Sequence, residues 1–176
     1  MINIYYVKNC KLKQYSNDFA KIAISKYLKI KKNDIQIKRD IYGKPYICNV
    51  PNVNLSVAHA KNAIVCAVTN KNIGIDLESI RSVKIDLVNR YYSKKEKEYV
   101  FSNSSDIEKR FTEIWTKKEA YLKYIGTGIM LPFSLFCTYD LLKIVYIRTF
   151  YIEEYICSVC YSNIKKQEKY KIISIS

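Results

Sequence analysis

The first half of the chain alternates short apolar runs with polar turns. Strict alternation predicts half-buried strands, and continuous apolar runs bounded by turn residues predict strands buried on both faces. We expect strands near 2–7, 35–39, 53–59, 63–69 and 73–78. Two turns separate them, one around YGKP at 42–45, which would present Lys44, and one at TNKN, 69–72.

In three other places apolar residues recur every three to four positions, which predicts helices. Ser16 is placed to cap a helix whose apolar residues share one face: Phe19, Ile22, Ala23, Tyr27 and Leu28. SKKE at 93–96 and SDIE at 105–108 both fit the capping-box pattern, and the second opens a long helix that Gly126 can end in a left-handed cap. Beyond Pro132 we expect the strands of an antiparallel sheet at 133–139, 144–152 and 155–161.

These elements predict an α+β fold with a boundary near Asn70, which divides the chain into an N-terminal half, 1–70, and a C-terminal half, 71–176. A chain of 176 residues has room for one good core or two small halves packed together. No apolar run approaches the ~18 residues that cross a bilayer, and the start is too polar for a signal peptide, so we expect a cytoplasmic protein without a membrane segment.

Charge and cysteine content add little. The net charge of +14 predicts an acidic partner, but Lys, Ile, Tyr and Asn are enriched along the whole chain, a bias that would add lysines without a binding role. Six cysteines are scattered, and Cys157 and Cys160 form a CxxC inside an expected strand, where a spacing of three sends the thiols to opposite faces. We interpret them as packing cysteines.

The stretch NIGIDLES carries two acids, Asp76 and Glu78, in an otherwise apolar strand. Residues two apart point to the same face, so the carboxylates are neighbours and repel each other. Their positive partner is either a basic side chain or a hard cation that prefers oxygen ligands.

On the long helix, Trp115, Glu119 and Lys123 follow one another at intervals of four and therefore lie in a row. Alone, this row is more simply explained as an exposed Glu–Lys pair beside a core tryptophan, worth about 0.3–0.5 kcal/mol. The single histidine, His59, would more often be a packing residue than a catalyst.

Order and spacing together make the chain resemble the 4'-phosphopantetheinyl transferases of the surfactin-synthetase-activating type. The resemblance runs from about Ile35 to Pro132. The matching pieces are Gly43-Lys44-Pro45, Ser56 to His59, Gly74 to Glu78, Trp115 to Lys123, and Gly126-Thr127-Gly128.

The resemblance implies a function, a ligand set and a fold. It implies transfer of phosphopantetheine from coenzyme A to a serine of an acyl or peptidyl carrier protein. Asp76, Glu78 and Glu119 would ligate Mg²⁺, while Lys44, Pro45, His59 and Lys123 would bind coenzyme A. Glu119, Lys123 and His59 would be catalytic. The fold implied is a monomer of two similar halves, a pseudo-dimer in which each half packs a long helix on a small antiparallel sheet.

Two features depart from the family pattern. Ala58 stands where the family commonly has a small hydroxyl residue, and the region before YGKP is short, so the residues that hold the 3'-phosphate of coenzyme A are not placed. Two alternatives stay open: an inactive transferase-like scaffold, and a basic RNA-binding module, for which the sequence has no recognised motif.

The titration of Glu119 can also be predicted. Lys118 and Lys123, together with the metal, are expected to depress the pKa of Glu119.

Overall fold

The structure is a computed structural model that describes residues 1–8, 15–128, 131–162 and 168–175. The strands are β1 Ile2–Lys8, β2 Ile37–Arg39, β3 Pro45–Ile47, β4 Asn54–Ala60, β5 Ala63–Thr69, β6 Ile73–Ser79, β7 Tyr146–Ile152, β8 Tyr155–Tyr161 and β9 Tyr170–Ser174. The α-helices are α1 Ser16–Leu28, α2 Ile85–Tyr91, α3 Lys94–Phe101, α4 Ile107–Ile125 and α5 Thr138–Leu141. Three 3₁₀ turns connect them: η2 Lys32–Asp34, η3 Ser104–Asp106 and η5 Phe133–Leu135.

Two larger sheets form the centre of the molecule. The first has the strand order β4-β5-β1-β9 and the second β6-β8-β7, while β2 and β3 form a separate hairpin. The inner faces of both sheets contribute to one apolar cluster, in which Ile2, Ile4 and Val65 of the first sheet meet Ile75 and Val159 of the second. The sheets therefore share a core, as the alternation of apolar residues requires.

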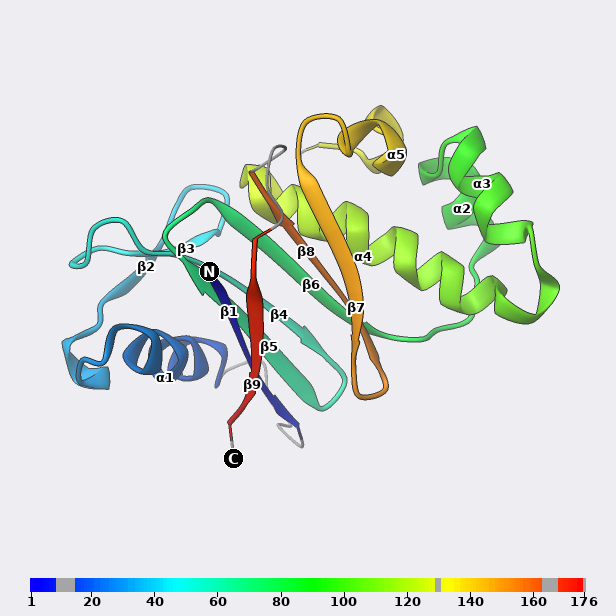
Figure 1. Ribbon diagram of the computed structural model, residues 1–176. Helices are drawn as coiled ribbons and strands as arrows, with labels where there is room; N and C mark the ends of the chain where they lie inside the picture. Colours follow the sequence, from blue (N-terminus) through cyan, green and yellow to red (C-terminus); the bar gives the residue numbers. More distant parts are fainter. Residues whose placement is uncertain (9–14, 129–130, 163–167, 176) are drawn as a thin grey trace.

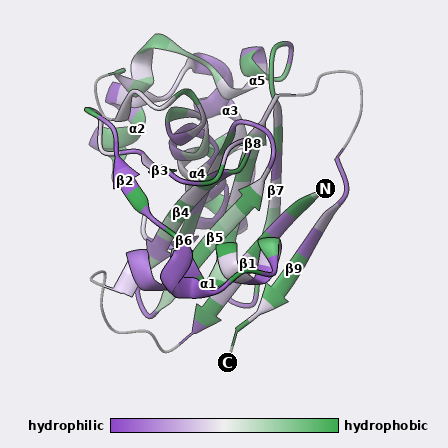
Figure 2. Cartoon of the chain, turned by 90° about the vertical axis from the view of Figure 1, so that its left-hand side faces the viewer, coloured by the Kyte–Doolittle hydropathy of each residue, from purple (hydrophilic) through white to green (hydrophobic). Residues whose placement is uncertain are grey.

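A helix covers the outer face of each sheet. Phe19, Ala23 and Ile24 of α1 pack with Tyr5 and Cys66 on the first sheet, and α1 turns a hydrophilic side outward (Figure 2). Helix α4 lies along β6 and β8, with α2 and α3 packed near its N-terminal end (Figure 1). The predicted α+β class is confirmed.

Helix ends follow the sequence signals in part. Ser93 and Glu96 form the predicted capping box of α3, and Gly126 ends α4 in the left-handed conformation, with φ 82°. Helix α1 begins at Ser16, with Tyr15 at the N-cap position. Helix α4 begins near SDIE as predicted, at Ile107, but its N-cap residue Asp106 makes no side-chain cap, so the predicted capping box there is wrong.

The region after Pro132 departs from the prediction. The expected strand at 133–139 is wrong, because these residues form η5 and the start of α5. Strand β9 leaves the second half and pairs with β1 in parallel, so the first sheet is antiparallel except at this edge. The boundary near Asn70 stays a prediction.

The cysteine interpretation agrees with the fold. Cys157 and Cys160 are free thiols on opposite faces of β8, as predicted. Cys157 belongs to the core between the sheets, and Cys160 packs against Ala120 of α4. Cys10 lies outside the described residues.

Candidate active site

The close approach of β6 and α4 builds the site. A Cβ atom at Gly74 would lie 2.0 Å from the carbonyl oxygen of Ala120 and 2.3 Å from the amide nitrogen of Tyr124, so only glycine permits this packing. Asp76 and Glu78 follow on the same face of β6 and therefore point to the side of α4 that carries Glu119 and Lys123.

Asp76 and Lys123 form the ion pair at the centre of the site. The Nζ atom of Lys123 donates to Oδ1 of Asp76 at 2.7 Å, and Asp76 is only 5% exposed. Burial lowers the pKa of Lys123, but Asp76, Glu119 and Glu78 together outweigh that effect and raise the pKa above its usual value. The second oxygen of Asp76, Oδ2, is buried and has no hydrogen-bond partner, so the pair leaves one acceptor open for a further cation or donor.

The two remaining acids hold protons more tightly than usual. Burial, then the charge of Asp76, raises the pKa of Glu119 to about 7, against the opposing effect of Lys123. Burial and Asp76 likewise raise the pKa of Glu78. The two lysines alone do not depress the pKa of Glu119: Lys123 lowers it less than burial and Asp76 raise it, and Lys118 is paired with Glu96 instead. The effect of the metal on this pKa stays a prediction.

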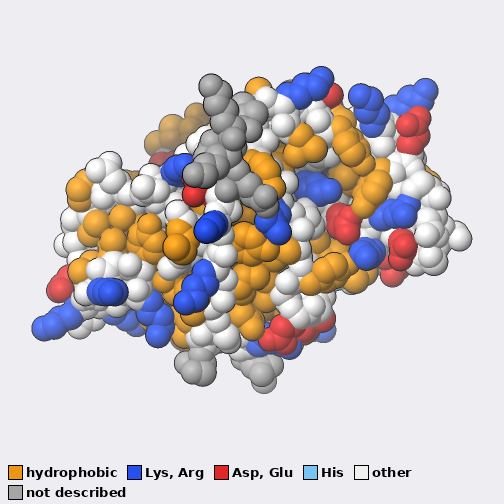
Figure 3. All heavy atoms as spheres, viewed as in Figure 1, with side chains coloured by type: hydrophobic (Ala, Val, Ile, Leu, Met, Phe, Trp, Pro, Cys, Tyr) orange, Lys and Arg blue, Asp and Glu red, His pale blue; other side chains and the backbone are white. Residues whose placement is uncertain are grey.

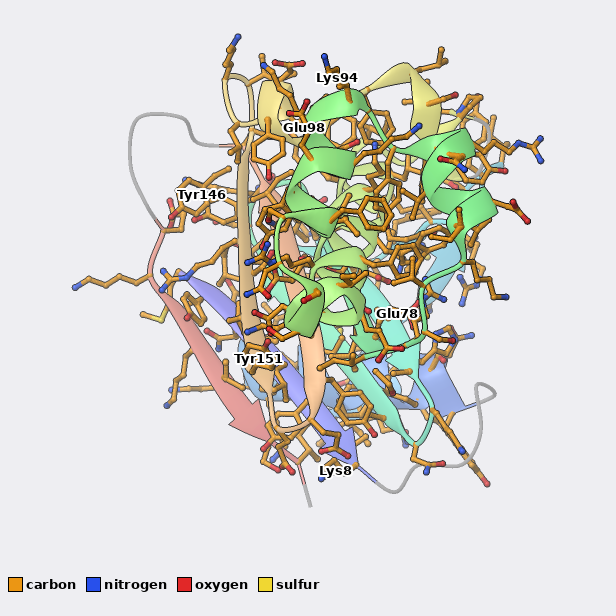
Figure 4. All side chains as sticks on the ribbon, turned by 90° about the vertical axis from the view of Figure 1, so that its right-hand side faces the viewer. Lys8, Glu78, Lys94, Glu98, Tyr146 and Tyr151 are labelled. Carbon is orange, nitrogen blue, oxygen red and sulfur yellow. The ribbon has the colours of Figure 1, made fainter. Side chains whose placement is uncertain are left out.

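Arg81 is a site residue that sequence reasoning missed. Its Nη2 atom lies 3.7 Å from Oε1 of Glu78, and its guanidinium lies 4.5 Å from the centre of the Trp115 ring. Its position three residues after Glu78 was the available signal. Figure 4 shows Glu78 beside α4, near the segment that leads from β6 to α2.

A cavity of about 190 Å³ adjoins Lys123. Lys44 and Pro45 from the β2–β3 hairpin line it with Arg39 and Gly126. The Nζ atom of Lys44 donates to the carbonyl oxygen of Tyr124 at 2.9 Å and to Oδ1 of Asn72 at 3.0 Å, which ties the hairpin to the end of α4. Lysine and arginine line this cavity and no acid is among its described lining residues, so it suits an anion.

A second cavity, of about 470 Å³, lies on the other side of Glu119. Most of its lining is apolar: Tyr91, Trp115, Leu122, Leu131, Pro132 and Phe133, with Arg90 and Ser134. Glu119 and Lys123 thus face different cavities, although they lie in one row with Trp115 on α4 as predicted.

His59 is the predicted site residue that lies apart. It is exposed on β4 and lines neither cavity. Ala58, its neighbour, is fully buried in the shared core. On the same strand, Ser56 lines the smaller cavity, and its hydroxyl accepts from the amide of Ile75 at 3.0 Å.

The donor set suits Mg²⁺ in its chemistry. Carboxylate oxygens are the ligands that magnesium prefers, Asp76 Oδ2 is buried without a partner, and the raised pKa values of Glu78 and Glu119 indicate acids that a nearby cation would stabilise as carboxylates. Within the ranges that the structure describes, no three His, Cys, Asp or Glu side chains are arranged to hold a metal ion.

Comparison with known proteins identifies the family. The sequence model of the 4'-phosphopantetheinyl transferase superfamily matches residues 72–173, more than half of the chain. The chain belongs to this superfamily. The match includes Asp76, Glu78, Glu119 and Lys123, and begins after Lys44 and His59.

Curated transferases agree with the predicted type. The chain is 30% identical to the 4'-phosphopantetheinyl transferase Sfp of Bacillus subtilis over 115 residues, which are 65% of this chain and 51% of that protein. It is 29% identical to the transferase gsp of Aneurinibacillus migulanus, over 69% of this chain and 53% of that one, and 31% identical to the transferase HetI of a Nostoc species, over 58% and 46%. The chain thus spans about half the length of the curated relatives it matches.

Proposed function

We propose that the protein is a Mg²⁺-dependent 4'-phosphopantetheinyl transferase, a holo-carrier-protein synthase. It would move phosphopantetheine from coenzyme A to a serine of an acyl or peptidyl carrier protein and release adenosine 3',5'-bisphosphate. The observation that supports this most is the placement of Asp76, Glu78, Glu119 and Lys123 on facing sides of β6 and α4, between an anion-suited cavity and an apolar one.

The cations would bind the pyrophosphate of coenzyme A. Lys44 and Lys123 line the smaller cavity, where paired phosphates would find two positive charges, and Pro45 would shape its wall. His59 is proposed as a further contact to the substrate, from the exposed end of β4.

The acids would serve the metal and the proton. Asp76, Glu78 and Glu119 would hold Mg²⁺, which when bound supplies charge stabilisation at the transferring phosphate. In the reaction the serine Oγ attacks the phosphorus that carries pantetheine, the P–O bond to the second phosphate breaks, and the serine proton must leave. Glu119 is the proposed acceptor, directly or through a water. Bound Mg²⁺ would lower its pKa from the raised value of about 7 and so keep it a carboxylate near neutral pH.

We also propose a pseudo-dimer of two similar halves meeting near Asn70, acting as a cytoplasmic monomer. The presence of one long helix on the outer face of each sheet supports the repeat. No helix in the described part of the chain is long and apolar enough to span a bilayer.

Two alternatives are less well supported. An inactive scaffold would have no need of the partly buried acids and the Asp76–Lys123 pair. For an RNA-binding module one expects clustered cations, whereas on the face shown in Figure 3 Lys and Arg side chains are scattered over the surface.

Intact-mass spectrometry tests the proposed function. Candidate apo carrier proteins are incubated with coenzyme A, Mg²⁺ and the protein, and the expected result is a mass gain of one phosphopantetheine that disappears with chelator. Glu119→Gln is the matched inactive control. Unmodified carriers across acyl and peptidyl types would contradict the proposal.

A further inference from the structure

A fully buried ion pair lies behind the proposed site. Glu96 of α3 and Lys118 of α4 are both 0% exposed, and Nζ of Lys118 lies 3.1 Å from Oε2 of Glu96. Lys94 and Glu98, on the same helix as Glu96, are exposed, and Figure 4 shows them on the outer side of α3. Glu96 is thus turned inward on a helix whose other charged residues are exposed or, for Lys97, partly exposed.

Every donor of Lys118 is used. Its ammonium has three hydrogens, and besides Glu96 it donates to the carbonyl oxygens of Phe133 at 3.0 Å and Phe136 at 2.7 Å. The carboxylate of Glu96 accepts from the amide of Thr138 at 2.8 Å and from the amide of Ser93 at 2.7 Å. The pair therefore bonds four backbone groups from two different segments.

Stability alone does not explain this arrangement. Desolvation offsets much of the attraction in a buried ion pair, and a well-packed apolar pair of similar size is often as stable. Hydrogen bonds to backbone groups add direction, which apolar contacts do not. Here they fix residues 133–138, a stretch without strand partners, against α3 and α4, three elements that Figure 1 shows close together.

The beginning of the fixed stretch lines the larger cavity. Phe133 and Ser134, with Pro132 before them, line it together with Trp115 and Glu119 of α4. The rings of Phe133 and Trp115 meet edge to face, with centroids 5.0 Å apart. Lys118, which anchors Phe133, directly precedes Glu119 in the sequence.

We propose that Glu96 and Lys118 are positioning residues that hold residues 133–138, and with them the cavity wall formed by residues 132–134, and so set the path by which the serine of a carrier protein reaches Glu119. The positioning of the cavity wall follows from the contacts described above. The approach of the carrier serine along it rests on the proposed function.

Trp115 is the single tryptophan of the chain, so its fluorescence measures directly how tightly the cavity wall is packed against it. In Glu96→Gln/Lys118→Met, which removes both charges and the two bonds to carbonyl groups, we expect acrylamide quenching of Trp115 to rise by about twofold or more, as for a locally loosened segment. The control Asp140→Asn/Lys143→Met removes an exposed ion pair nearby and should leave quenching unchanged. Equal quenching in the folded variant and the wild type would overturn the proposal.

Steady-state kinetics of the double variant test whether the wall guides the carrier serine to Glu119. We expect kcat/KM for a carrier protein to fall about 100-fold, the usual scale for a misplaced reacting group. The Kd for coenzyme A should change less than about threefold, since neither Glu96 nor Lys118 is among the residues that line the smaller cavity. A parallel loss of coenzyme A binding would overturn the positioning role. If wild type modifies no carrier but quenching responds as expected, the proposed function fails and the wall stands.

Hydrogen exchange keeps the proposal testable if the double variant does not fold. In the wild-type protein, peptides covering residues 132–138 should exchange about as slowly as α4, because the pair ties them to it. Exchange as fast as in the exposed 40–43 turn would overturn the proposal.

Discussion

At the scale of single residues, the site depends on how few positive charges face its acids. Lys123 is the lysine that faces Asp76, while Lys118, five residues before it on the same helix, is turned away to Glu96. Glu119 lies between these two lysines in the sequence, yet burial and Asp76 dominate its titration and raise its pKa to about 7. The direction in which neighbouring side chains point, and not their place in the sequence, therefore decides which charges shift the pKa of an acid.

The first prediction concerns Glu119 as the proton acceptor. A base must be unprotonated, and the pKa of Glu119 before the metal binds is raised to about 7, so protonation competes with both metal binding and proton transfer; kcat/KM for coenzyme A should therefore fall as the pH drops below about 7. Glu119→Gln should lower carrier modification at least ~100-fold and abolish this acid limb. The measurement is a pH profile of initial rates, with exposed Glu108→Gln on the same helix as the control. Near-normal turnover of Glu119→Gln at saturating Mg²⁺ and coenzyme A would disprove both roles assigned to it.

At the scale of elements, the contact between β6 and α4 brings the acids and Lys123 together. The contact needs a residue without a side chain at position 74, where the obstructing atoms are helix backbone that cannot rotate away. The hydroxyls of Thr116 and Ser158, 2.8 Å apart, join the same helix to β8. The glycine of the GIDLE stretch therefore has a packing role that is separate from the chemistry of the acids.

The second prediction is the effect of Gly74→Ala. Forcing a methyl group into this contact should lower the free energy of unfolding by about 3 kcal/mol, at the upper end for overpacking, and separate Asp76 from Lys123. Urea denaturation measures the loss. Gly43→Ala is the comparison, because its Cβ would meet open space at a φ of 83° and only backbone strain of about 1 kcal/mol is expected. Equal effects at the two positions would show that the close approach is not needed.

At the scale of the whole molecule, the last strand of the chain lies beside the first. Strand β9 pairs with β1 at the edge of the first sheet, after the second sheet is complete. At the entry to β9, Glu168 accepts from Lys71 at 2.5 Å and from the amino group of Met1 at 3.3 Å. The first sheet is thus closed by residues from the far end of the sequence.

The third prediction concerns acid sensitivity of this closure. The hydrogen bond from Lys71 lowers the pKa of Glu168 most; desolvation opposes it, and the hydrogen bond and charge of the amino terminus add to the lowering, so that the pKa falls to about 2. A lowered folded-state pKa gives stability that is present above the unfolded value of about 4.3 and is lost as the pH falls toward 2.

Glu168→Gln should therefore reduce the free energy of unfolding at pH 6 by about 1 kcal/mol or less, the range for exposed pairs, and the difference from wild type should shrink between pH 5 and pH 2. Urea unfolding at several pH values measures it, with exposed Glu98→Gln as the control. A difference that does not vary with pH would contradict the ion-pair explanation.

Local patterns determined most of the elements and part of the site. Alternation fixed which residues of β6 face the core and which face α4, so Asp76 and Glu78 lie side by side as predicted. The spacing of four fixed the row of Trp115, Glu119 and Lys123, and the motifs together predicted the family. These properties depend on residues two to four positions apart, which the sequence places by itself.

Tertiary structure decided what depends on distant partners. It made 133–138 a 3₁₀ turn and the start of α5 instead of a strand, because backbone groups of this stretch bond side chains on α3 and α4. It also placed β9 beside β1, brought Arg81 over Trp115, and left His59 outside both cavities. A pattern of apolar residues indicates that a face is buried, but only the assembled fold shows which element covers it. Burial in that fold and the nearby charge of Asp76 then raise the pKa of Glu119.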